Sequence, residues 1–217
     1  MLDQARIAAL LQPFAPQVSL ELARQLQTYL DLLLRWNARM NLTAVRDPEQ
    51  TVTRHFGESL FAARVLRDAG AFDSAKDVPS TLADVGSGAG FPGIPIKLFI
   101  PNLQLTLIES QNKKATFLRE VVRALSLSHI VVYCGRAESW GHTAQLVTLR
   151  AVERFGDVVP VAARLVAPDG TLALLIGESQ ARAAACLLGP GWASPVSRRI
   201  PESEGRTVWL ARRRSPN

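Results

Sequence analysis

The stretch TLADVGSGAGFPG, residues 81–93, restricts the fold of this 217-residue chain more than any other. A short apolar run that contains Asp84 is followed by three glycines at alternate positions, Gly86, Gly88 and Gly90. Pro92 then stands where a helix can begin, because an N–H group there would have no partner. Glycines permit positive φ and let a ligand approach the backbone, and a helix N-terminus offers N–H groups to a polar or negative group. The stretch therefore predicts a strand, a tight turn and a helix start that bind a nucleotide-like ligand.

Two ligand-binding patterns fit this turn. Residues 88–93 match G-x-G-x-x-G, which is typical of NAD-dependent oxidoreductases, and Glu109 lies near the roughly 20-residue spacing of a ribose-binding acid. Residues 84–90 match D-x-G-x-G-x-G, the pattern of S-adenosylmethionine-dependent methyltransferases. We favour the second pattern because the first leaves Gly86 without a role at the strand end. A turn with no ligand is disfavoured because each glycine costs backbone entropy.

Composition places the chain among cytoplasmic globular proteins. A hydrophobic content of 47% over 217 residues is enough for one sizeable core. The two cysteines, Cys134 and Cys186, lack the spacing of a zinc site or a disulfide framework and fit a reduced compartment. Cys134 follows an apolar run, which predicts a small buried side chain. No leader-like segment and no run of roughly 18 apolar residues is present, so we expect no membrane association.

The charge balance favours a polyanionic partner only weakly. The net charge is +6 and the pI is near 10.0, and arginine carries most of the positive charge. Arginine suits two-pronged contacts with phosphate, but many soluble proteins of similar charge bind no nucleic acid. Six arginines against two glutamates lie between residues 198 and 214.

Hydrophobic periodicity predicts an α/β fold with a helical N-terminal segment. We expect helices over residues 3–11, 20–40 (capped by Ser19) and 49–68 in a segment spanning 1–75, which packs on a core spanning 76–217. In the core, strands are expected over 82–85, 104–108, 130–133, 145–149 and 171–176, and helices over 92–100, 112–125, 155–165 and 178–188. A terminal hairpin of 195–200 and 207–211 completes a Rossmann-like, doubly wound, mostly parallel seven-stranded sheet.

Ligands of such sheets lie beyond the carboxyl ends of the strands, where the strand order reverses. With the order three-two-one-four-five, one pocket should collect the residues that end the first four strands: Gly86, Glu109, Ala137 with Glu138, and Arg150. Glu109 has two oxygens that can accept ribose hydroxyls. Glu138 either accepts an adenine amino group or begins a helix. Arg150 follows an apolar strand and needs a partner, and we favour a substrate or cofactor over a structural salt bridge.

The sequence resembles the bacterial glucose-inhibited-division-B methyltransferases from about Trp36 to Gly177. The resemblance rests on these short motifs: Trp36-Asn37, Asn41-Leu42-Thr43, Arg46-Asp47-Pro48, Arg54-His55, residues 84–93, Lys113-Lys114 and Phe117-Leu118. It implies a methyltransferase that uses S-adenosylmethionine to modify N7 of a guanosine in 16S ribosomal RNA of the small ribosomal subunit or its precursor. We expect a monomer.

The resemblance also implies site residues. The cofactor would be held by Gly86, Phe91, Ala137, Glu138 and Arg150, together with the turn residues Gly88 and Gly90. The chain departs from the family pattern at two places. Ala144-Gln145 stands where an aromatic-Asp pair is usual, and Ile176-Gly177 stands where Lys-Gly is usual.

A mechanism follows from this nucleophile. Guanine N7 carries a lone pair and no proton, so it attacks the sulfonium methyl without a general base, and catalysis becomes mainly positioning. Arg150, or Asn41 and Arg54 beside His55, would donate to guanine O6. We also expect His55 among the substrate-binding residues because it stands beside Arg54, with a structural role as the alternative. A small-molecule methyltransferase and an NAD-dependent oxidoreductase remain as alternatives.

Overall fold

The computed structural model describes residues 2–72, 80–151 and 154–215. Its N-terminal part is helical, in five consecutive segments: α1 (Gln4–Leu11), α2 (Leu20–Met40), α3 (Pro48–Thr51), a π-helical segment (Val52–Gly57) and α4 (Glu58–Asp68). Asp3, Ser19 and Asp47 cap α1, α2 and α3, because each side chain accepts an N–H of the first turn. No helix in the described residues is both long and apolar enough to cross a membrane.

The sequence predicts one regular helix over 49–68, and here the structure differs. The chain is helical from residue 48 to 68, but residues 52–57 have π geometry between two α-helical stretches. Hydrophobic periodicity does not distinguish the two, because a single π turn leaves the apolar face nearly continuous. Arg54 and His55 lie in this π segment. Small and polar residues from Gly70 to Ser80 predict a link into the core sheet, but most of this link falls on residues 73–79, which lie outside the described residues.

From residue 81 onward, strands and helices alternate. The strands are β1 (Thr81–Val85), β2 (Gln104–Glu109), β3 (Ile130–Cys134), β4 (Ala144–Arg150), β5 (Val166–Gly177), β6 (Val196–Arg199) and β7 (Arg206–Arg212). The helices between them are α5 (Gly93–Phe99), α6 (Asn112–Ala124), a 3₁₀ turn (Ala137–Ser139), α7 (Phe155–Arg164) and α8 (Glu178–Leu188). These elements agree with the predicted ranges, although β5 begins five residues earlier than expected (171 − 166 = 5).

The sheet has the order β3-β2-β1-β4-β5-β7-β6. The first five strands are parallel, and β7 runs antiparallel to both β5 and β6. The predicted seven-stranded, mostly parallel sheet is therefore confirmed. A second dinucleotide-binding half would continue the sheet with parallel strands, so the terminal hairpin disfavours the NAD-dependent alternative.

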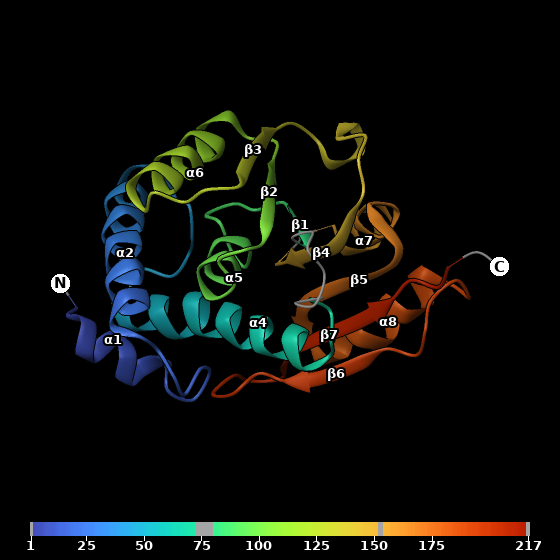
Figure 1. Cartoon of the computed structure of the whole chain (residues 1–217), viewed down its shortest axis with the longest axis horizontal. Helices are drawn as coiled ribbons and strands as arrows, with labels where there is room; N and C mark the ends of the chain where they lie inside the picture. Colours follow the sequence, from blue (N-terminus) through green and yellow to red (C-terminus); the bar gives the residue numbers. More distant parts are fainter. Residues whose placement is uncertain (1, 73–79, 152–153, 216–217) are drawn as a thin grey trace.

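Helices cover both faces of the sheet (Figure 1). The N-terminal helices share one apolar cluster with α5 and α6, while α7 and α8 contribute to a second. On β5, Ala173 and Leu175 belong to the first cluster, and Leu172, Leu174 and Ile176 belong to the second. Each strand therefore sends alternate side chains to opposite faces, as the period of two requires.

The prediction that Cys134 is buried is wrong. Cys134 ends β3, and its side chain is exposed rather than buried. The reason is the position of β3 at the edge of the sheet, which the apolar letters of the strand do not reveal. Cys186 is exposed as well.

The glycine turn is fixed from below by Asp84. This carboxylate is fully buried, and it accepts the Thr148 hydroxyl (2.7 Å) and the Gly93 N–H (3.2 Å). A Cβ at Gly93 would lie 2.8 Å from a carboxylate oxygen of Asp84, so a larger residue is excluded there. The sequence suggests that the start of α5 offers its N–H groups to a ligand, but the Gly93 N–H is bonded to Asp84 instead. The acid of the D-x-G-x-G-x-G pattern is thus a structural clamp.

The turn is held from the N-terminal side by Tyr29 of α2. The Tyr29 hydroxyl donates to the Ala89 carbonyl, and its ring stacks on Phe91 with centroids 5.4 Å apart. Gly90 has a φ of +90°, and a Cβ there would collide with the Tyr29 hydroxyl and the Ile94 side chain. Only glycine satisfies both restrictions at position 90.

We predict that Gly90→Ala destabilises the protein by about 2–4 kcal/mol, since strain at positive φ and overpacking act together. The free energy of unfolding from denaturant titration measures this effect. In a Tyr29→Phe background the same substitution should cost less, because the colliding hydroxyl is gone. Strictly additive costs would show that the hydroxyl does not fill this space.

Candidate functional site

A cavity of about 250 Å³ opens at the carboxyl ends of β1, β2 and β3. Its lining includes residues that directly follow these strands and one from the segment before α7: Gly86, Ser110, Gly135, Arg136, Ala137, Glu138 and Arg154. The structure thus brings Gly86, Ala137 and Glu138 together, as the strand-end rule predicts. Gly86 has a φ of +66°, and no atom lies within 4 Å of the position that a Cβ would take there. The turn is therefore open toward a ligand at this residue.

Glu109 lies behind the turn rather than in the cavity lining. Its side chain is buried, and its two oxygens accept the N–H groups of Gly88 (2.9 Å) and Gln111 (2.8 Å). Its neighbours Ile108 and Ser110 do line the cavity. Each carboxylate oxygen has a second lone pair, so both remain able to accept a hydroxyl. Glu109 thus holds the β1 turn in addition to any contact with a ligand.

Three other predicted cofactor residues, Gly88, Gly90 and Phe91, do not line this cavity either. Phe91 is buried, and its ring stacks on His55 with centroids 4.8 Å apart. The aromatic faces of Phe91 are therefore occupied by the helical segment. Gly88 and Gly90 shape the turn through positive φ values of +56° and +90°.

Arg150 was expected at this cavity, but it is not among the residues that line it, and its contact with a cofactor or substrate stays a prediction. Its guanidinium lies on the other face of the sheet, where Nη2 donates to Glu58 Oε2 (3.1 Å), to the Arg54 carbonyl (2.7 Å) and to His55 Nδ1 (3.0 Å). Because Leu149 belongs to the α7–α8 cluster, the next side chain must point toward the N-terminal helices. The structural salt bridge that we disfavoured is present.

The carboxylate of Glu58 serves two arginines. Arg206 of β7 also lies 3.1 Å from Glu58 Oε2, and the Glu58 side chain is only 3% exposed. Among the described residues, Nε and Nη1 of Arg150 and Nε of Arg206 are buried without a hydrogen-bond partner. Burial lowers the pKa of Arg150 to about 10, so its guanidinium still carries its charge at neutral pH. The cluster therefore has one more positive than negative charge.

His55 is neutral in this environment. Arginine can only donate, so Nδ1 accepts from Arg150 and Nε2 carries the proton toward Thr43 Oγ1, which lies 2.7 Å away. Burial, followed by the charges of Arg150, Arg54 and Arg206, lowers the pKa of His55 to about 3. Both ring nitrogens are engaged within the fold, so His55 is not arranged as a free proton acceptor in this structure.

Asn41 and Arg54 lie at the surface of the N-terminal segment and do not line the cavity. Asn41 ends α2 in the left-handed region, with φ of 47°, and its Oδ1 accepts from Arg46 (2.8 Å). The Arg54 carbonyl accepts a hydrogen bond from Arg150, while the Arg54 side chain is exposed. Of the three predicted substrate residues, Asn41 and Arg54 are thus accessible, and His55 is largely enclosed.

Sequence reasoning missed several residues of this region. Gly135 and Arg136 directly precede Ala137, and the strand-end rule extends to them without further assumptions. Nothing in the sequence indicates that Glu58 and Arg206 meet, because an acid in a helix and an arginine in a hairpin are usually surface residues. Their pairing depends on contacts between distant elements.

The sheet order, the glycine turn and the cavity beside it define a class I S-adenosylmethionine-dependent methyltransferase. Solved structures with this fold include a ribosomal protein L11 methylase from Lactobacillus delbrueckii subsp. bulgaricus, with a TM-score of 0.56 and 17% identity over 74% of this chain and 80% of that chain. Another is M. jannaschii TYW2 in complex with AdoMet, with a TM-score of 0.50 and 15% identity over 70% of this chain and 74% of that one.

Sequence comparison identifies the family. The profile of the GidB family, described as rRNA small subunit methyltransferase G, matches residues 22–187. The ribosomal RNA small subunit methyltransferase G of Xylella fastidiosa (strain 9a5c) is 42% identical over 77% of this chain and 74% of its own length. The protein of that name from Stenotrophomonas maltophilia (strain R551-3) is 42% identical over 80% of this chain and 78% of its own length. The chain belongs to this family.

The neutral, largely enclosed His55 predicts a pH dependence of stability. Its pKa in the folded state, about 3, lies below its ordinary value of 6.5, so the unfolded chain binds the proton first as the pH falls. The stabilisation is complete above pH 6.5 and is lost progressively below it. Between about pH 7.5 and 5.5, the free energy of unfolding of the native protein should fall by about 1.4 kcal/mol more than that of His55→Gln.

Denaturant titrations at the two pH values measure this difference. His142→Gln is the control, because the His142 side chain is exposed. Equal losses of unfolding free energy in the native protein and in His55→Gln would contradict a neutral imidazole at this position.

Proposed function

We propose that this chain transfers a methyl group from S-adenosylmethionine to N7 of a guanosine in 16S ribosomal RNA. The observation that carries the proposal is the cavity at Gly86, Ala137 and Glu138, formed by the glycine turn of a chain that belongs to the rRNA small subunit methyltransferase G family. The N7 position follows from the resemblance of the motifs. We further propose that the enzyme acts as a monomer in the cytoplasm, on the small ribosomal subunit or its precursor.

The residues around the cavity fit this cofactor. The bare backbone of Gly86 lets a ligand approach the end of β1, and the Glu138 carboxylate offers an acceptor for an adenine amino group. Glu109 would accept ribose hydroxyls with the lone pairs that Gly88 and Gln111 leave free. When bound, S-adenosylmethionine supplies an electrophilic methyl group on its sulfonium. In the described part of the chain, Cys134 and Cys186 are exposed, and neither lines the cavity.

The protein residues contribute positioning rather than proton transfer. Guanine N7 has no proton to lose, and His55 is neutral with both ring nitrogens engaged. Arg150 acts as a positioning residue, since it holds the π segment through the Arg54 carbonyl and His55 and lies 5.9 Å from the Phe91 ring centroid. We propose that residues 1–75 form a wall for RNA against the core, 76–217, with Asn41 and Arg54 as donors.

Nucleoside mapping tests the proposed reaction. Ribosomal RNA from cells with and without the gene is digested and analysed by mass spectrometry, and one N7-methylguanosine of 16S RNA should disappear with the gene. An unchanged nucleoside profile would favour a small-molecule acceptor instead. A thermal shift with S-adenosylhomocysteine but not with NAD distinguishes the methyltransferase from the oxidoreductase alternative.

We predict that Glu109→Ala weakens S-adenosylhomocysteine binding by about 1.5–3 kcal/mol, the range for hydrogen bonds to charged groups. The ribose loses an acceptor, and the turn loses the bonds to Gly88 and Gln111. Isothermal titration calorimetry gives the affinity. Glu204→Ala removes an exposed acid from the β6–β7 turn and should leave binding unchanged. A native affinity in Glu109→Ala would exclude the assignment.

We predict that Arg54→Ala leaves S-adenosylhomocysteine affinity unaltered but slows methylation of ribosomal RNA. Loss of one phosphate contact should reduce the salt slope of RNA binding by about one unit. Arg123→Ala is the matched control, because Arg123 is exposed on α6, outside the N-terminal segment, and does not line the cavity. If Arg54→Ala instead lowers cofactor affinity, the N-terminal segment is a cap over the cofactor.

A further inference from the structure

A second cavity, of about 1000 Å³, lies at the amino ends of the strands, opposite the ends that carry the glycine turn. α7 ends at Arg164 immediately before β5 begins at Val166, so residues here mark the amino end of β5. The glycine-turn cavity lies at the carboxyl ends of the strands, and the two cavities have no lining residue in common. The methyl-transfer site therefore does not account for this second cavity.

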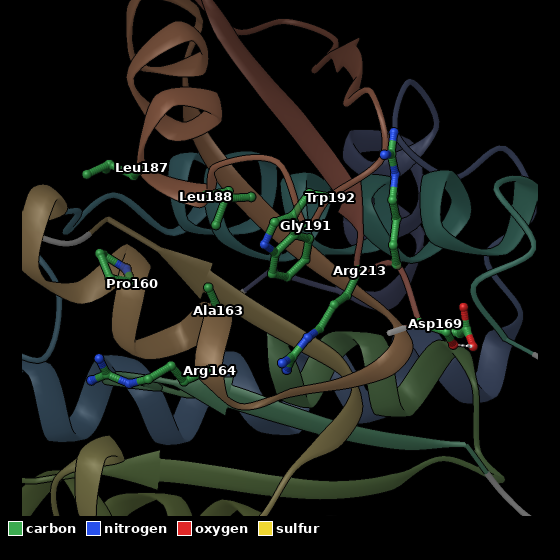
Figure 2. Close-up of a pocket in the computed structure, with 11 residues that line it drawn as sticks. Pro160, Ala163, Arg164, Asp169, Leu187, Leu188, Gly191, Trp192 and Arg213 are labelled. Carbon is green, nitrogen blue, oxygen red and sulfur yellow. Dashed lines mark hydrogen bonds between the residues drawn. The ribbon is translucent and has the colours of Figure 1, made fainter. Parts of the chain in front are cut away.

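The cavity has an aromatic residue beside an apolar wall. Figure 2 shows Trp192 between the apolar side chains of Ala163 and Leu188 on one side and Arg213 on the other. Trp192 is half-buried, and Pro160 and Leu187 extend the apolar wall. The cavity thus offers an aromatic and apolar surface on which one face of a flat ligand can pack.

Backbone pairing holds the aromatic and cationic side chains in place. Trp192 pairs with Arg213 in an antiparallel β-bridge, so their side chains lie on the same face. The flanking bonds run from Ala193 N to Arg212 O (2.9 Å) and from Arg214 N to Gly191 O (3.0 Å). The tryptophan is therefore presented by paired backbone rather than by a free loop.

Three arginines line the cavity against one carboxylate. Arg164 and Arg214 are exposed, and neither forms an ion pair within the described ranges. Arg213 uses Nη1 for the Val166 carbonyl (2.5 Å), which leaves most of its five N–H donors for another partner. Asp169, the carboxylate, bonds to the Ser215 hydroxyl. The lining therefore carries an excess of two positive charges (3 − 1 = 2).

We propose that this cavity binds one nucleotide of single-stranded RNA, with the base stacked on Trp192 and the adjoining phosphates on Arg164, Arg213 and Arg214. An aromatic side chain beside arginines suits single-stranded nucleic acid, because every base has a π face and every phosphate between nucleotides carries a negative charge. The proposal rests on the RNA substrate proposed above. It adds an RNA contact at the amino end of β5, on the opposite side of the sheet from the carboxyl ends where the guanosine would react.

Binding of a fluorescent single-stranded 12-mer RNA, followed by anisotropy, tests the cavity without methylation. Trp192→Ala should raise the dissociation constant about tenfold, the size of one lost stacking contact, and Trp192→Phe should retain most of the affinity. The double variant Arg164→Ala/Arg214→Ala should weaken binding and reduce the salt slope by about two units, since two phosphate contacts are lost. Arg123→Ala is again the control for charge, because Arg123 is exposed and lines neither cavity.

The same variants distinguish this contact from the reaction. With 16S ribosomal RNA as substrate, Trp192→Ala should raise KM about tenfold, while kcat and S-adenosylhomocysteine affinity stay native. The double arginine variant keeps the test valid if Trp192→Ala fails to fold, because both of its side chains are exposed.

Three results would overturn the proposal. Native RNA affinity in the folded variants would show that RNA does not use the cavity. Binding of guanosine monophosphate as tight as that of the 12-mer would make it a site for free nucleotides. An effect on small ribosomal subunits with none on naked RNA would assign it to a ribosomal protein. If the native chain binds RNA through Trp192 but methylates none, the proposed function fails and this contact stands.

Discussion

The ion pair between Arg150 and Glu58 is the contact on which the arrangement of the two parts of the chain depends. It joins β4 to the start of α4, and Arg206 adds β7 to the same carboxylate. Arg150 also holds the π segment through the Arg54 carbonyl. Removing one partner of a buried pair typically costs about 3–5 kcal/mol, because the other charge is left without a counter-ion. Without Glu58, two guanidiniums would remain in an apolar region.

This cluster determines how the glycine turn is supported. Burial and the charge of Arg150 keep His55 neutral, and Arg150 orients its ring. His55 stacks on Phe91, and Phe91 stacks on Tyr29. The turn is therefore supported from the N-terminal side by aromatic rings, and Asp84 clamps it from below. The side at Gly86 stays free for a ligand. The helical segment thus supports the turn beside the cavity even though none of its described residues lines the cavity.

Much of the fold could be predicted because it depends on local periodicity. The strand ranges, the sheet order and the meeting of Gly86, Ala137 and Glu138 follow from alternating elements and from the rule for strand ends. The direction of Arg150 was also available in principle, since Leu149 belongs to the apolar run that faces α7. The π segment had no signal, and the exposure of Cys134 depends on which strand lies at the edge. Pairings across distant elements, such as that of Glu58 with Arg206, depend on tertiary packing that no local pattern encodes.

The net charge of +6 describes three different groups of arginines. Arg150 and Arg206 stabilise the junction between the parts of the chain, and their charges are not available to a partner. A second group forms exposed ion pairs with neighbouring acids, and these contribute little to stability or to an external field: Arg6, Arg24 and Arg154. Arg54, Arg164 and Arg214 belong to neither group, and they lie near the two regions that we assign to RNA. Net charge alone is a weak predictor of nucleic-acid binding because it does not separate these groups. The groups are separated by what each guanidinium contacts in the folded chain.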